Sequence, residues 1–166
     1  MRPARATAQT DPPTEALETF LKAHRVLFEA LDSELRAQVG LSIAQLEVLQ
    51  ALAQAPEGRL RMMDITKRMC VSKSGVTQLV DRLEERGLVA REFTRSDRRL
   101  TYATLTEAGA EASQRALPAF HDAARTHLSR HLSDDDLCCL QTTLSKLLEG
   151  SRSPAEARVA VARAER

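Results

Sequence analysis

The stretch that most constrains the fold runs from residue 72 to residue 87 and predicts one amphipathic helix with a defined start and end. Its apolar side chains recur at the i, i+3, i+4 and i+7 spacing of a single helical face: Val76, Leu79, Val80 and Leu83. Ser72 is a residue type that caps helix starts, and Gly87 is a type that ends helices in the left-handed conformation. We expect this helix to bury one face and to leave the other in solvent.

The solvent face of this predicted helix is made of hydroxyls, an amide, cations and one carboxylate. Its members are Lys73, Ser74, Thr77, Gln78, Asp81 and Arg82. Hydroxyls, amides and cations are the groups that meet phosphates and base edges in the major groove of DNA. An ordinary surface helix has the same pattern, so the flanking sequence has to decide between these two interpretations.

The flanking segments predict a helix-turn-helix followed by a β hairpin. Leu60 begins a short extended segment, and residues 62–69 form a short helix that a tight turn joins to the next one, as in a helix-turn-helix. Residues 88–93 and 100–105 are β-rich runs of six, separated by the polar residues 94–99. The fold class that follows is mainly α with a two-stranded β wing, a winged helix-turn-helix.

Helices are predicted on both sides of this lobe. One covers residues 14–40 and ends at Gly40, and a second begins with a capping box at Ser42. Thr106 caps another long helix after the wing, and Ser133 opens a last helix that continues to residue 150. The long end helices cannot easily bury their apolar faces within one chain, so we expect them to need a partner.

The expected organisation has four parts, and the composition supports a packed core. Apolar residues make up 43% of the 166 residues but aromatic ones only 3%, so the core consists mainly of Leu, Val and Ala. The parts are a disordered lead-in (1–13), dimerisation helices (14–40 and 107–150), a winged helix-turn-helix lobe (41–106) and a tail that is a weak helix or disordered (151–166).

The charges are distributed unevenly along the chain, although the net charge is only +1. Residues 59–99 contain eleven Arg or Lys and six Asp or Glu, a net charge of +5, and the remainder has a net charge of −4. A basic middle between acidic ends is expected of a compact module that faces DNA.

Several other classes of protein are disfavoured. The three cysteines, Cys70, Cys138 and Cys139, form neither a disulfide framework nor a metal-binding spacing. Residues 1–14 lack the apolar run of a secretory signal, and no stretch approaches the ~20 apolar residues of a membrane span. The sequence has no glycine-rich phosphate loop and no nucleophile elbow. We therefore expect a cytoplasmic protein that is not an enzyme and that needs no cofactor.

Three short blocks together resemble the MarR (multiple antibiotic resistance regulator) family of winged helix-turn-helix transcription factors. They are Val71–Val89, the wing tip Ser96-Asp-Arg-Arg99 and the segment Leu105-Thr-Glu-Ala-Gly109. The resemblance covers roughly residues 15–149. It implies a regulator that binds double-stranded DNA as a homodimer, which we expect to be a repressor released by a small anionic or phenolic ligand.

The resemblance also assigns roles to the wing tip. It implies that Asp97 holds Arg99 in a pose that inserts into the minor groove, whose negative potential attracts arginine. Arg95 and Arg98 then contact phosphates. We expect Arg99→Ala to weaken operator binding by about 1–3 kcal/mol, because it removes one good base contact.

The chemistry of the side chains suggests the remaining DNA contacts. Gln78 is the best candidate for direct readout, because an amide can bind adenine through two hydrogen bonds. Ser72, Ser74 and Thr77 are candidates for base edges or phosphates, and Lys73, Arg82, Arg59 and Arg61 for the backbone. Asp81 is expected to pair with Arg82 or with another basic neighbour. Gly75 fits either a close approach of the DNA backbone or tight local packing.

A two-fold dimer implies a pseudo-palindromic operator with half-sites about one turn, ~10 bp, apart. His24 and Arg25 on the first helix, and Arg91 at the base of the wing, are candidates for a ligand carboxylate, since a bidentate arginine suits that geometry. The competing interpretation is that His24 is an ordinary packed side chain and that Arg25 is solvated or forms an interhelix salt bridge.

Three alternatives stay open at this point. His127 and His131 have the i, i+4 spacing that can chelate zinc, with His121 nearby, but nothing obvious completes a ligand set. Cys138 and Cys139 allow a redox sensor, although buried packing is the more common role for cysteine. Winged helices also serve as protein-interaction modules that bind no DNA.

Overall fold

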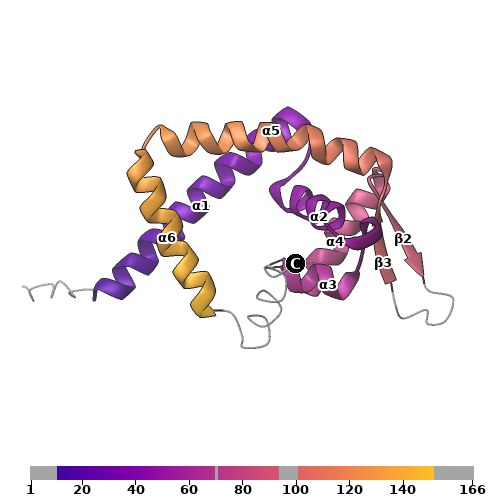
Figure 1. Cartoon of the computed structure of the whole chain (residues 1–166), viewed down its shortest axis with the longest axis horizontal. Coiled ribbons are helices and arrows are strands. Elements are labelled where there is room, and N and C mark those ends of the chain that lie inside the picture. Colours follow the sequence, from indigo (N-terminus) through magenta and orange to yellow (C-terminus); the bar gives the residue numbers. More distant parts are fainter. Residues whose placement is uncertain (1–10, 70, 94–100, 152–166) are drawn as a thin grey trace, which may run out of the picture. The chain divides into compact units, whose positions relative to one another are not determined.

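The computed structural model describes residues 11–69, 71–93 and 101–151 of the chain. The chain divides into two compact units, Met1–Ala124 and Arg125–Arg166. The elements in chain order are α1 (Pro12–Val39), α2 (Ile43–Ala53), the short 3-10 helix η1 (Pro56–Gly58), β1 (Arg59–Arg61), α3 (Met62–Arg68), α4 (Lys73–Glu85), β2 (Val89–Phe93), β3 (Thr101–Leu105), α5 (Glu107–Ser129) and α6 (Asp134–Ser151). Figure 1 labels all of them except η1 and β1.

The wing is a three-stranded antiparallel sheet in the order β1-β3-β2, so the prediction of two strands is wrong. The short extended segment predicted at Leu60 pairs with β3, with Leu60 opposite Ala103. Both of these side chains are buried, so the third strand closes one side of the core. On the other side of β3, Val89 pairs with Leu105 and Phe93 with Thr101.

The helix ends follow the capping chemistry of the sequence. Ser42 and Gln45 form the expected capping box at the start of α2, and the Ser72 side chain accepts a hydrogen bond from the Gly75 backbone N–H. Gly40 and Gly87 follow α1 and α4 with positive φ of 70° and 69°, the left-handed conformation that suits glycine. These local signals predict the start of α2, the end of α1 and both ends of α4.

The core lies where α2 and α4 meet the sheet. Val76, Val80 and Leu83 on α4 have no exposed surface, which confirms the predicted apolar face, and Leu79 is partly buried against the same cluster. The start of α5 lies close to the first residues of the wing. A Cβ atom at Gly109 would overlap the backbone carbonyl oxygen of Leu88, so this approach requires glycine.

Two hydrogen bonds attach the end of α1 to the lobe. The Asp32 carboxylate accepts from the Ile43 backbone N–H at 2.7 Å, which occupies a free donor at the start of α2. The Arg86 guanidinium, just after α4, donates to the Gly40 carbonyl oxygen at 2.8 Å. The C-terminal part of α1, from Asp32 to Gly40, is therefore fixed to the start of α2 and to the end of α4.

Some predicted boundaries differ from the structure. The first helix begins at Pro12, inside the predicted lead-in, because proline suits the first turn of a helix. The last helix continues through Gly150 to Ser151. Cys138 and Cys139 are exposed on α6 in the single chain, so the prediction that they are buried by packing stays untested for the expected homodimer. Cys70 and the tail from residue 152 lie outside the described residues.

Candidate nucleic-acid interface

The outer face of α4 presents the polar side chains that the sequence predicted. Lys73, Ser74, Thr77, Gln78 and Arg82 are exposed. Among the described residues, Gln78 and Arg82 have no hydrogen-bond or ion-pair partner for their side chains, so their donors are available to a ligand. The face combines an amide and cations on a rigid helix, which are the groups that bind base edges and phosphates.

The first turn of α4 uses part of its hydroxyl chemistry internally. Ser72 caps the helix through the Gly75 N–H at 3.2 Å and lies 3.0 Å from the Ser74 hydroxyl. Thr77 donates to the Lys73 carbonyl oxygen at 3.0 Å. A Cβ atom at Gly75 would overlap Cγ1 of Val71, so of the two explanations for this glycine the structure favours local packing.

Asp81 pairs with Arg91 on β2 rather than with its neighbour Arg82. The Arg91 guanidinium lies 2.6 Å from Asp81 and 3.5 Å from Glu84, and it also donates to the Thr77 carbonyl oxygen at 3.2 Å. The Arg91 side chain is only 20% exposed, which limits the screening of these charges by water. One arginine therefore links three positions on α4 to the first strand of the hairpin.

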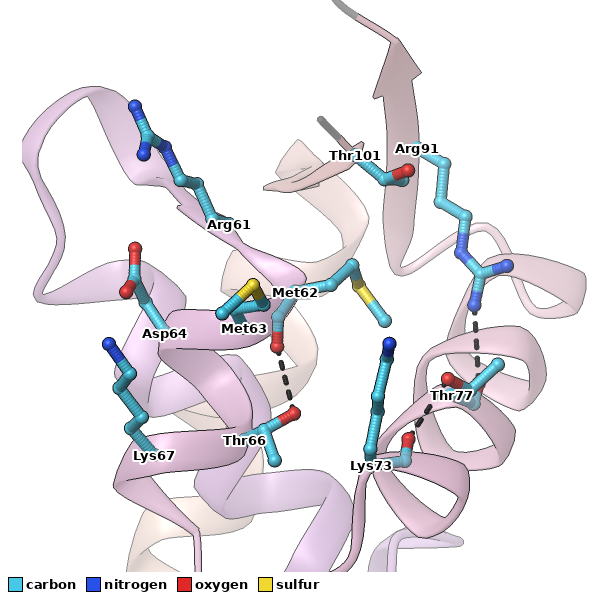
Figure 2. A pocket seen from close by; sticks show the side chains of 10 residues that line it. All are labelled: Arg61, Met62, Met63, Asp64, Thr66, Lys67, Lys73, Thr77, Arg91 and Thr101. Atoms are coloured by element: carbon cyan, nitrogen blue, oxygen red, sulfur yellow. Dashed lines mark hydrogen bonds between the residues drawn. The ribbon is translucent and has the colours of Figure 1, made fainter. Parts of the chain in front are cut away.

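A pocket of about 610 Å³ lies between α3, α4 and the sheet (Figure 2). It is lined by Arg61, Met62, Met63, Asp64, Thr66, Lys67, Lys73, Thr77, Arg91 and Thr101. Figure 2 shows the Lys73 side chain reaching toward Met62 between α3 and α4, whereas the guanidinium of Arg61 points away from Lys73. The pocket thus lies between the helix-turn-helix and the wing strands.

Two arginines and a tyrosine extend this surface over the sheet. The guanidinium carbons of Arg59 and Arg61 lie 5.5 Å and 5.7 Å from the centre of the Tyr102 ring. Arg59 also pairs with Glu57 at 2.6 Å, and the Arg61 Nε donates to the Tyr102 hydroxyl oxygen at 2.9 Å. That hydrogen bond raises the pKa of the Arg61 guanidinium, which keeps its positive charge.

The wing tip and the first helix contain the other predicted site residues. Arg95, Asp97, Arg98 and Arg99 lie outside the described residues, so their roles stay predictions. His24 on α1 lies between two phenylalanines, with ring centroids 6.2 Å from Phe20 and 5.8 Å from Phe28. Arg25 is exposed on the same helix. The structure therefore does not bring His24 and Arg25 into the pocket that Arg91 lines.

The predicted zinc alternative lacks a ligand set among the described residues, because no group of three or more His, Cys, Asp or Glu side chains there could hold a metal ion. In the same part of the chain, none of the helices has the length and hydropathy that crossing a bilayer requires.

Sequence reasoning missed two residues of this surface, Tyr102 and Lys67. The alternation of side chains along β3 places Tyr102 on the face opposite Ala103, which is a signal that could have identified it. Its contact with Arg61 depends on the register of β1 and β3, which the sequence did not reveal. Lys67 lines the pocket from α3, as Asp64 does. The i, i+3 spacing of these two residues places them on one face of the helix, and it was the only signal in the sequence.

Comparison with known proteins identifies relatives along most of the chain. The model of the MarR family matches residues 39–100. The HTH-type transcriptional repressor MdtR of Bacillus subtilis (strain 168) is 36% identical over 90 residues, which are 54% of this chain and 54% of MdtR. The chain thus spans about half the length of this curated relative.

Two crystal structures from Streptomyces coelicolor extend the similarity. AbsC, a MarR family transcriptional regulator, is 31% identical with a TM-score of 0.72, over 87% of this chain and 97% of AbsC. Sco3205, a MarR family transcriptional regulator solved in complex with DNA, is 28% identical with a TM-score of 0.75, over 87% of this chain and 92% of Sco3205. These relatives are transcriptional regulators and not enzymes. With the winged helix-turn-helix fold and this similarity over most of its length, the chain belongs to the MarR family of transcriptional regulators.

Proposed function

We propose that this protein is a dimeric, sequence-specific DNA-binding regulator that represses transcription. The observation that carries the proposal is the outer face of α4, where exposed Gln78 and Arg82 have no partner among the described residues and lie on a helix fixed to the wing by Arg91. A helix with these groups reads base edges in the major groove. The repressor name of MdtR and the DNA complex of Sco3205 support the same conclusion.

The DNA contacts we propose combine base readout with phosphate binding. Gln78 reads a base edge, with Ser72, Ser74 and Thr77 beside it. Lys73, Arg82, Arg59 and Arg61 bind the backbone from α4 and from the edge of the sheet. In the wing tip, Arg99 enters the minor groove, Asp97 orients it, and Arg95 and Arg98 contact phosphates.

Exposed apolar side chains support the proposed homodimer. On α1 they are Leu17, Phe20, Leu21, Val26 and Phe28, with exposed fractions between 40% and 65%. On α6 they are Leu140, Leu147 and Leu148, exposed by 40% to 64%. Such a quantity of apolar surface is typical of an interaction site. We expect sedimentation velocity to show a dimer at micromolar concentration, and a monomer there would contradict this part of the proposal.

A gel-shift titration with the DNA upstream of the protein's own gene tests DNA binding directly. We expect a complex that resists unlabelled random-sequence competitor and weakens steeply as salt is raised, because counterions are released from the phosphates. Arg99→Ala weakens it by about 1–3 kcal/mol, whereas Lys22→Gln on α1 serves as a matched loss of charge and leaves it unchanged. Absence of a complex at low salt would instead favour a winged-helix module that binds proteins.

A small anionic or phenolic effector is a second part of the proposal, favoured by the pocket between α3 and α4. A ligand there acts by binding a DNA-incompetent arrangement more tightly than the competent one. The cations that line the pocket are Arg61, Lys67, Lys73 and Arg91. A ligand carboxylate that binds Arg91 has to compete with Asp81 and Glu84 for it. His24 and Arg25 on α1 are the candidates for a separate site. A thermal-shift screen of aromatic acids and phenols, followed by release of DNA by the hits, tests this part.

A further inference from the structure

Tyr102, the single tyrosine of the chain, lies between two arginines on one face of the sheet. Arg61 and Tyr102 are directly opposite each other across β1 and β3, and the neighbouring pair, Leu60 and Ala103, is buried on the other face. Because side chains alternate along strands, Arg59 shares the face of Arg61 and Tyr102. The guanidinium carbons of both arginines lie near the same ring, 5.5 Å and 5.7 Å from its centre.

The two arginines differ in how their charges are compensated. Arg59 lies 2.6 Å from the Glu57 carboxylate, so its charge has a counter-ion on the protein. Arg61 has no carboxylate within ion-pair distance among the described residues, and its hydrogen-bond partner is the neutral Tyr102 hydroxyl at 2.9 Å. A neutral partner fixes the position of a guanidinium but leaves its charge and its remaining N–H donors free.

The position of Arg61 relative to α4 suits a contact with the backbone of DNA bound by that helix. It is the last residue of β1 and immediately precedes α3, and it lines the same pocket as Lys73 of α4 and Thr101 of β3. The end of the sheet that contains Arg61 therefore borders the same pocket as the start of α4. A duplex read by α4 holds that helix in its major groove with the first residues at the base edges, and the sugar-phosphate backbones that border the groove lie to either side of the helix.

We infer that Tyr102 is a positioning residue that holds the Arg61 guanidinium ready for a phosphate of the DNA backbone. The inference rests on the proposed function, because it requires that α4 binds DNA. An arginine in open solvent loses rotamer freedom when it binds a phosphate, and a prior contact with Tyr102 removes part of that loss. The cation–π contact holds the guanidinium near the ring, and the hydrogen bond to the hydroxyl fixes its orientation.

A double-mutant cycle separates this role from a structural one. Tyr102→Phe keeps the ring and removes only the hydroxyl, and Arg61→Gln removes the charge. Dissociation constants are measured by fluorescence anisotropy on a duplex that the wild-type protein binds. We expect Tyr102→Phe to weaken binding about two- to tenfold in the wild-type background and to have no effect in the Arg61→Gln background.

The salt dependence gives a second readout. The logarithm of the association constant falls linearly as the logarithm of the salt concentration rises. Arg61→Gln makes this slope less steep by about one, as expected for one lost phosphate contact, and Tyr102→Phe leaves the slope unchanged. Lys22→Gln on α1 is the control for a lost charge elsewhere and changes neither quantity. Equal losses from Tyr102→Phe in both backgrounds, or no loss in the wild-type background, would overturn the inference. A wild-type protein that binds no duplex would overturn the proposed function itself.

Discussion

The Arg91 guanidinium on β2 lies 2.6 Å from the Asp81 carboxylate on α4, and it joins the two elements that we propose to enter adjacent grooves of DNA. The same guanidinium lies 3.5 Å from Glu84 and donates to the Thr77 carbonyl oxygen. Because Asp81 and Glu84 are one helical turn apart, the contacts fix the rotation of α4 about its axis as well as its distance from the strand.

Removal of this link is expected to lower both stability and DNA affinity. Arg91→Met leaves Asp81 and Glu84 without a counter-ion and removes a charge-assisted hydrogen bond, so we expect a loss of about 1–3 kcal/mol of unfolding free energy. Urea denaturation measures it. The control is Lys22→Gln, which breaks the exposed pair with Glu18 at 3.6 Å and is expected to change stability by less than about 0.5 kcal/mol. Equal effects of the two changes would contradict a structural role for Arg91.

The contact between Gly75 and Val71 predicts a second-site rescue. Gly75→Ala introduces a Cβ atom that overlaps Val71 Cγ1, which disturbs the turn into α4 and weakens DNA binding. In the Val71→Ala background the obstructing methyl group is absent, so Gly75→Ala is tolerated and its helix propensity stabilises α4 by up to about 1 kcal/mol. Thermal unfolding and anisotropy titrations check this. If the Val71→Ala, Gly75→Ala double variant regains stability but still binds DNA weakly, Gly75 is needed for the close approach of the DNA backbone.

The approach of α5 to Leu88 predicts opposite effects at two helical glycines. Gly109→Ala forces a Cβ atom against the Leu88 carbonyl oxygen, a backbone atom that cannot move away, and we expect a loss of about 1–3 kcal/mol. A Cβ atom at Gly150 in α6 meets nothing within 4 Å, so Gly150→Ala is neutral or stabilising by up to about 1 kcal/mol. Chemical denaturation of both variants measures the difference, and destabilisation by Gly150→Ala would be contrary to the structure.

The start of α6 predicts a pH dependence. The Asp136 carboxylate accepts two hydrogen bonds from Ser133, one from the hydroxyl at 2.6 Å and one from the backbone N–H at 3.0 Å. These hydrogen bonds lower the pKa of Asp136. The stabilisation is therefore fully present above the unfolded-state pKa of about 3.9 and is lost as the pH falls through the lower folded-state pKa. We expect a carboxyl NMR titration to show this pKa rising toward its ordinary value in Ser133→Ala. An unchanged pKa would show that the hydroxyl does not hold the carboxylate.

The helices and their ends were predictable because their determinants are local. Ser72, Gly87 and the apolar stripe of α4 lie within one short stretch, and the structure confirms each of them. The extended segment at Leu60 was predicted, but its place in the wing was not, because Arg59–Arg61 is only three residues long and becomes a strand only when β3 pairs with it.

The residues of the candidate site were predictable by chemical type but not by their partners. The exposed face of α4 follows from the helical period, whereas the choice of Arg91 over Arg82 as the partner of Asp81 depends on how α4 packs against β2. The Tyr102 contact likewise depends on the register of β1 and β3. Such contacts join residues far apart in sequence, and no local pattern specifies them.

The preference of Gln78 for one base is the most direct test of the proposal that the outer face of α4 reads DNA. The measurement is the dissociation constant for a scrambled duplex divided by that for a duplex selected for binding to the wild type. It is made for the wild type, for Gln78→Ala and for the control Gln38→Ala on α1. We predict a wild-type ratio of at least about 10³, a loss of about ten- to a hundredfold in Gln78→Ala, and no loss in Gln38→Ala. A wild-type ratio near one, or a ratio that Gln78→Ala leaves unchanged, would contradict the account.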